Sequence, residues 1–128
     1  MTADDFRRLA LSFAETEERA HMNHPDFRVA GRIFATLGHP DARWGMVSLT
    51  PVLQEEFVKA APKVFKPVKG GWGIRGATNV FLPAATQKTL RPALEAAWYT
   101  TSLKGLKPSA RTRKGPPKPR TNRRKEGA

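Results

Sequence analysis

The basic residues of this chain are unevenly distributed, and this limits the part that can fold. The chain has 128 residues and a formal net charge of +12. Residues 104–128 carry ten basic residues and one acid, whereas residues 1–103 carry 13 basic and 10 acidic residues. The last segment contains prolines but no aromatic or β-branched apolar residue, so it cannot bury enough apolar surface to offset the entropy lost on ordering. We therefore predict one domain over residues 1–103, followed by a disordered basic tail over residues 104–128.

Composition excludes several classes of protein. The chain has no cysteine, which rules out disulfides, thiolate nucleophiles and zinc–thiolate sites. No apolar run approaches the ~18 residues that a membrane span needs. The first residues are acidic rather than apolar, unlike a signal peptide. We expect a cytoplasmic protein that has no membrane partner.

Three segments have the apolar spacing of helices. The first follows Thr2, a candidate N-cap, and the second opens at Thr50 with a proline in its first position. The third spans residues 90–98 and contains Pro92, which a helix tolerates only in its first turn. We therefore expect this helix to start near Leu90 with Thr89 as its cap, or to be kinked if it starts at Thr86.

Short runs typical of strands lie between the helices, at residues 27–29, 32–37, 44–49, 64–68 and 79–82. The first two predict a hairpin around residues 30–31. A two-residue loop would pair Val29 with Arg32. The apolar pattern favours a three-residue loop, which would expose Arg28 and leave Phe34 on the outer face. Because strands and helices do not alternate regularly, we predict an α+β domain with a twisted antiparallel sheet and helices packed on one face.

A glycine-rich segment, residues 68–80, lies between the last two of these strands. It reads Val-Lys-Gly-Gly-Trp-Gly-Ile-Arg-Gly-Ala-Thr-Asn-Val. Glycines allow a ligand or another backbone to come close, and Trp72 and Arg75 would suit a flat or anionic partner. The alternative is a glycine-rich turn whose tryptophan packs over the edge of the sheet.

Several segments, in this order, resemble the MmcQ/YjbR family of small bacterial proteins. The resemblance covers roughly residues 1–103. It rests on Asp5-Phe6-Arg7-x-Leu9-Ala10-Leu11-Ser12, Glu17-Glu18, His24-Pro25-Asp26-Phe27-Arg28-Val29, Gly31-Arg32-Ile33-Phe34-Ala35-Thr36-Leu37, Trp44-Gly45-Met46-Val47-x-Leu49-Thr50-Pro51, Gly70-Gly71-Trp72-Gly73-x-Arg75-Gly76-Ala77-Thr78-Asn79-Val80 and Leu90-x-x-Ala93-Leu94-x-x-Ala97-Trp98.

The resemblance implies a CyaY-like fold, in which two helices pack on a twisted antiparallel sheet and a short helix lies between strands. It also implies double-wing DNA binding. That function has been assigned to the family mainly because its fold and surface are similar to those of DNA-binding proteins. The basic tail is not part of the family pattern, and Pro92 departs from it near the last helix.

The residues give little support for catalysis. His21 and His24 have no evident third metal ligand, so we expect no metal and no other cofactor. The serines lack the context of a nucleophile elbow. Glu15, Glu17 and Glu18 crowd together after the first helix, where we expect a solvated acidic turn. Trp44 and Trp98 fall in apolar patterns and are expected in the core. We therefore predict a protein that is not an enzyme.

Nucleic-acid binding has better support, because basic residues on hairpins and in a tail can contact phosphates without reading sequence. We predict a low-specificity DNA-binding protein. An anionic-ligand site or a protein-interaction surface on the glycine-rich loop is the alternative. The predicted nucleic-acid contacts are Arg28, Arg32, Lys69, Trp72 and Arg75 in the domain, and Lys104, Lys107, Arg111, Arg113, Lys114, Lys118, Arg120, Arg123, Arg124 and Lys125 in the tail.

Overall fold

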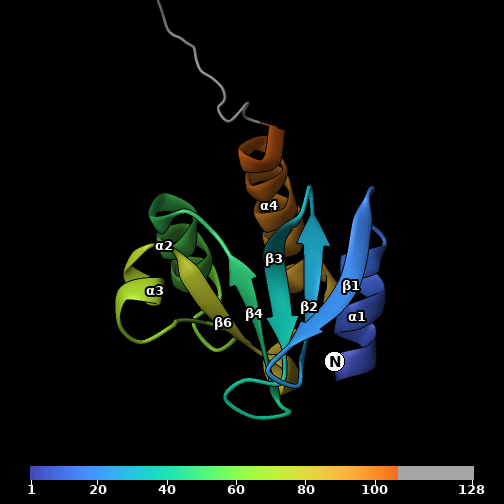
Figure 1. The fold of residues 1–128 in the computed structure, drawn as a ribbon. Helices are drawn as coiled ribbons and strands as arrows, with labels where there is room; N and C mark the ends of the chain where they lie inside the picture. The colour runs from blue at the N-terminus through green and yellow to red at the C-terminus, as the bar shows by residue number, and fades with distance from the viewer. Residues whose placement is uncertain (107–128) are drawn as a thin grey trace, which may run out of the picture.

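The computed structural model describes residues 1–106, which form one open sheet with helices packed against it (Figure 1). The strands are β1 (Thr16–His21), β2 (His24–Val29), β3 (Arg32–Leu37), β4 (Trp44–Ser48), β5 (Phe65–Pro67) and β6 (Ala77–Phe81). The helices are α1 (Ala3–Leu11), α2 (Pro51–Ala60), α3 (Gly71–Ile74), the short 3-10 helix η1 (Leu82–Ala84) and α4 (Gln87–Leu106).

All neighbouring strands of the sheet are antiparallel, in the order β1-β2-β3-β4-β6-β5. Helices α1 and α4 lie against one face of it and contact each other. Their apolar residues, among them Phe6 and Leu94, join Phe27, Val47 and Val80 of the sheet in one buried core. The α+β class and the antiparallel sheet with helices packed against it are therefore confirmed. None of the helices in the described residues is long and apolar enough to cross a membrane.

The start of each long helix follows from its capping residue. Thr2 and Asp5 form a reciprocal capping box at α1, and Thr50 caps α2 ahead of the proline at position 51, as predicted. Of the two expected starts of the last helix, Leu90 is wrong and Thr86 is the nearer one, because α4 begins at Gln87. Thr86 and Thr89 exchange hydrogen bonds between side chain and backbone there, at 2.9 and 3.2 Å. The helix is therefore capped at Thr86, and Pro92 lies inside it rather than in its first turn.

The β2–β3 hairpin also differs from the expected register. Its loop has two residues, and Val29 pairs with Arg32. Both loop residues, at positions 30 and 31, have positive φ, the pattern of a type I′ turn that matches the twist of the strands. The register then shifts, so that Phe27 faces Ala35. This irregularity restores the apolar alignment without a longer loop, and Phe34 is fully buried rather than on the outer face.

Strand β1 was not expected from the sequence. Glu17 and Glu18, predicted in a solvated turn, lie in this strand and pair with Arg28 and Phe27 of β2. The Glu18 carboxylate accepts a hydrogen bond from Arg7 Nε of α1 at 3.0 Å. A strand of charged residues at the edge of a sheet has no apolar alternation to reveal it.

The two tryptophans expected in the core are half-buried. Trp98 stacks on Phe13 with ring centroids 5.8 Å apart, and its Nε1 donates to the Ala14 carbonyl. Trp44 packs against Phe81, its cross-strand partner, at 4.8 Å. Both rings therefore pack against other aromatic side chains at the margin of the core.

Candidate nucleic-acid interface

Three of the predicted nucleic-acid contacts surround one pocket. The pocket has a volume of about 350 Å³. It lies where β3 begins, β4 ends and the last turns of α4 pass the sheet. Its lining combines three cations with two hydroxyl groups and contains no carboxylate. The lining residues are Arg28, Gly31, Arg32, Ile33, Ser48, Thr101 and Lys104.

The pocket forms because β3 and β4 separate at this end of the sheet. These two strands pair only through Ala35–Leu37 and Gly45–Val47. The first residues of β3 and the last residue of β4 therefore lie beyond the ladder. Helix α4 closes in from the side, where Gly105 comes so near Ala30 that a Cβ on this glycine would lie 2.2 Å from the Ala30 Cβ. The absence of a side chain at position 105 thus allows Lys104 to reach the hairpin turn.

Arg28 is held in a fixed position at the edge of this pocket. Its Nε donates to Asp26 Oδ1 at 2.8 Å and its Nη2 donates to Oδ2 at 3.2 Å. The Asp26 carboxylate has no exposed surface and also lies 2.7 Å from His21 Nδ1. The hydrogen bonds from Arg28 hold the pKa of Asp26 below its usual value, and Asp26 in turn raises the pKa of Arg28. Much of the charge of Arg28 is therefore balanced inside the protein.

Arg32 and Lys104 are placed differently. Both are exposed, and within residues 1–106 neither forms an ion pair. Their charges are therefore available to an external anion, whereas Arg28 contributes an oriented guanidinium group.

The other predicted contacts of the domain lie on the loop that contains α3. Gly73 packs on Val68, and Gln54 Nε2 donates to the carbonyls of Gly73 and Ala77, each at 2.9 Å. This loop presents Trp72 with 70% of its surface exposed. The alternative in which that ring packs over the sheet edge is therefore wrong.

Arg75 is exposed on the same loop, with its guanidinium 5.8 Å from the centre of the Trp72 ring, and Lys69 is exposed just before α3. The α3 loop and the pocket lie at the same end of the sheet, since Ser48 of the pocket pairs with Ala77, directly after this loop. They are two separate groups of residues. The remaining predicted contacts, from Lys107 to Lys125, lie outside the described residues.

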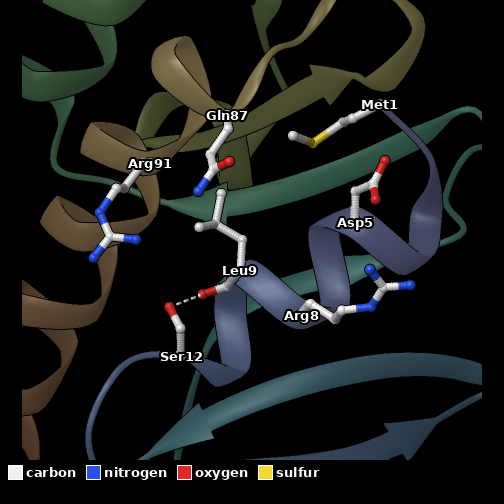
Figure 2. Close-up of a pocket in the computed structure, with 7 residues that line it drawn as sticks. All are labelled: Met1, Asp5, Arg8, Leu9, Ser12, Gln87 and Arg91. Carbon is white, nitrogen blue, oxygen red and sulfur yellow. Dashed lines mark hydrogen bonds between the residues drawn. The ribbon is translucent and has the colours of Figure 1, made fainter.

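A second pocket, of about 430 Å³, was not predicted (Figure 2). It lies between the first residues, α1 and the start of α4, and charged residues of both signs line it. Arg8 pairs with Asp4 at 3.1 Å, Asp5 belongs to the α1 cap, and Arg91 lies over the Phe13 ring. The other lining residues are Met1, Leu9, Ser12 and Gln87. Its lining includes the Asp5 carboxylate, whereas no carboxylate lines the pocket beside Arg32.

The histidines do not gather into a metal site. His21 contacts Asp26, while His24 and His39 meet edge to face at 5.9 Å. Within residues 1–106 no group of three or more histidine or acidic side chains is arranged to hold a metal ion. His21 instead belongs to the group around the buried Asp26 carboxylate, whose other partner is Arg28.

Comparisons with known proteins agree with this fold. No curated protein matches the chain. The crystal structure of the Deinococcus radiodurans protein DR2400, described with the family-model domain DUF419, superposes with a TM-score of 0.67 at 19% sequence identity. The match covers 86% of this chain and 85% of that one, and at this identity it shows a shared fold. The YjbR family model matches residues 11–100. The chain therefore belongs to the YjbR family.

Proposed function

We propose that this protein binds DNA with low sequence specificity, through contacts to the phosphate backbone and without catalysis. The observation that carries the proposal is the convergence of Arg28, Arg32 and Lys104 around one pocket, at the end of the helix that leads into residues 107–128. Nine further lysines and arginines follow within residues 107–125. The pocket cations would orient the backbone, and the following cations would supply most of the long-range attraction.

The charges of the domain support this division of roles. Residues 1–103 are nearly balanced, with 13 basic and 10 acidic residues, so attraction by net charge falls mainly to the segment after them. Cations that contact phosphates release counterions from DNA, and each phosphate neutralised contributes about −0.9 to the slope of log K against log salt. Contacts of this kind position a protein on DNA but read no bases.

The decisive experiment compares DNA binding by the full chain and by a variant in which the nine lysines and arginines of residues 107–125 are replaced by glutamine. If about five of them contact phosphates, the salt slope on duplex DNA flattens by about 5 units. Residual binding at low salt should then depend on Arg32 and Lys104. If the variant retains the full slope, the segment does not contribute. If neither protein binds DNA at low salt, the proposed function is wrong.

The α3 loop supports a second candidate, a surface for a protein or a small anionic ligand. Trp72 and Ile74 are 70% and 77% exposed on it, and Arg75 lies beside the tryptophan ring. Both side chains lie on the same four-residue helix, and exposed apolar surface is typical of interaction sites when it is contiguous. If this candidate is correct, Trp72→Ala leaves binding to both duplex and single-stranded DNA unchanged.

A further inference from the structure

We propose that the pocket between β3, β4 and the end of α4 is a binding site for a terminal phosphate monoester. Such a group occurs at the 5′ end of a nucleic-acid strand and on a free nucleotide or sugar phosphate. The inference deepens the proposed function and rests on it, because it assigns to the same basic residues a preference for strand ends over internal phosphates.

The charge of the lining suits a group with more than one negative charge. Arg32 and Lys104 have no ion-pair partner within residues 1–106, and no carboxylate lines the pocket. Arg28 adds a guanidinium group that Asp26 already orients. A phosphate monoester carries about −1.5 to −2 charges at pH 7, whereas an internal diester carries one. Two uncompensated cations therefore match the monoester better.

Two of the residues that line the pocket, Thr101 and Ser48, carry hydroxyl groups that can act as uncharged donors. Thr101 is buried, with 4% of its surface exposed, and Ser48 is half-buried. Within residues 1–106 neither hydroxyl has a hydrogen-bond partner. A buried hydroxyl left without a partner costs free energy, and a phosphate oxygen in the pocket would accept its hydrogen bond.

The way a phosphate is joined to its neighbours also distinguishes an end group. The volume of the pocket, about 350 Å³, lies near the lower limit of small-ligand sites. An internal phosphate carries a nucleotide on both sides, so it lies across the mouth of such a pocket, whereas a terminal phosphate can enter it with its sugar behind.

Three probes test the inference on the full chain: a 12-nucleotide single strand with a 5′-phosphate, the same strand with a 5′-hydroxyl, and adenosine monophosphate. We expect the phosphorylated strand to bind about tenfold more tightly, the gain of one hydrogen-bonded charged group. Thr101→Val and Ser48→Ala, which change no charge, should each reduce this preference several-fold. Lys104→Gln should abolish most of it. Lys59→Gln, which removes a lysine from the last turn of α2, is the matched control and should leave it intact.

The outcomes separate the two sources of the phosphate and the two proposals. Preference for the phosphorylated strand with weak binding of adenosine monophosphate identifies a strand end. Tight binding of adenosine monophosphate that Thr101→Val weakens identifies a small phosphate ester. Equal affinity for the two strands, with no binding of adenosine monophosphate, overturns the inference and leaves the proposed function standing. A phosphate preference that Thr101→Val, Ser48→Ala and Lys104→Gln all leave unchanged also overturns the inference, because the phosphate then binds elsewhere. Failure to bind either strand at low salt contradicts the proposed function itself.

Discussion

Arg28 Nε lies 2.8 Å from Oδ1 of Asp26, a carboxylate with no exposed surface in strand β2. The pair joins the stability of the fold to the geometry of the basic pocket, because the same guanidinium group lines that pocket. A substitution that removes Arg28 therefore acts on both, and the two effects have to be measured separately.

Arg28→Ala should destabilise the domain strongly. It leaves the buried Asp26 carboxylate with His21 as its remaining partner, and removing one member of a buried pair is costly. We expect the thermal midpoint to fall by roughly 10 °C, with a smaller fall for Arg28→Lys, which cannot form both hydrogen bonds. Arg32→Ala, the exposed control, should change it by less than about 3 °C. Equal midpoints for Arg28→Ala and Arg32→Ala, measured by circular dichroism, would show that the ion pair is not structural.

Acid should remove part of the stability through Asp26. The hydrogen bonds from Arg28 lower the pKa of this carboxyl in the folded protein. Its contribution is therefore fully present above the unfolded pKa of about 3.9 and is lost as the pH falls through the lower folded value. At pH 5, Asp26→Asn should have a lower free energy of unfolding than the wild type. Between pH 5 and pH 2, this free energy should fall less in the variant than in the wild type. Glu55→Gln, at an exposed position of α2 that forms no ion pair within residues 1–106, is the control. If the free energy of unfolding of Asp26→Asn falls with pH as steeply as that of the wild type, the prediction is wrong.

The contact between α4 and the hairpin turn predicts a rescue. Gly105→Ala places a Cβ about 2.2 Å from that of Ala30, so the end of α4 must move away and the pocket must open. Ala30→Gly removes the opposing atom and also suits the positive φ of 54° at this position. We expect Gly105→Ala to lower the thermal midpoint and to weaken binding of the phosphorylated strand, and the double variant to restore both. If Gly105→Ala alone has no effect on either measurement, the close approach does not shape the pocket.

Arg32→Gln should weaken DNA binding to a similar extent for all sequences. A contact to a phosphate carries no base information, so the loss of one contact reduces the salt slope on duplex DNA by about 0.9. The measurement is a fluorescence titration of two unrelated duplexes over a range of salt. Lys63→Gln, an exposed lysine outside the pocket, provides the comparison. A loss confined to one duplex would instead indicate that Arg32 reads a base.

Trp72→Ala should leave the fold intact, because most of the ring is exposed and α3 is held by Gln54 and the glycine contacts. If the ring stacks on unpaired bases, as expected of a predicted nucleic-acid contact, binding to single strands falls about tenfold while duplex binding changes little. Arg75→Ala separates the ring from its neighbouring charge. A thermal midpoint that falls by more than about 5 °C in Trp72→Ala would mean that the ring contributes to folding after all.

Local signals in the sequence were sufficient for much of the fold. The caps at Thr2 and Thr50, the strand at residues 44–49 and the arms of the last hairpin all follow from nearby residues, since capping and alternation act over a few positions. The same signals failed at Thr86, where two threonines cap each other, and at β1, whose charged residues have no apolar pattern. Family membership was also recognisable, because the ordered segments survive in the sequence itself.

The pocket, by contrast, depends on tertiary structure. Arg28 and Arg32 were both predicted contacts. Asp26 is two residues from Arg28, so a strand places both on one face, but only the packing shows that Asp26 is buried and that Arg32 is left free. Lys104 is 72 residues from Arg32 along the chain and reaches the pocket only because Gly105 packs on the β2–β3 turn. The β2–β3 register shifts at Phe34, and β3 pairs with β4 only from Ala35 onward. Sequence specifies which residues carry charge, whereas the packing of α4 on the sheet decides which charges face one another, because long-range contacts have no local signature.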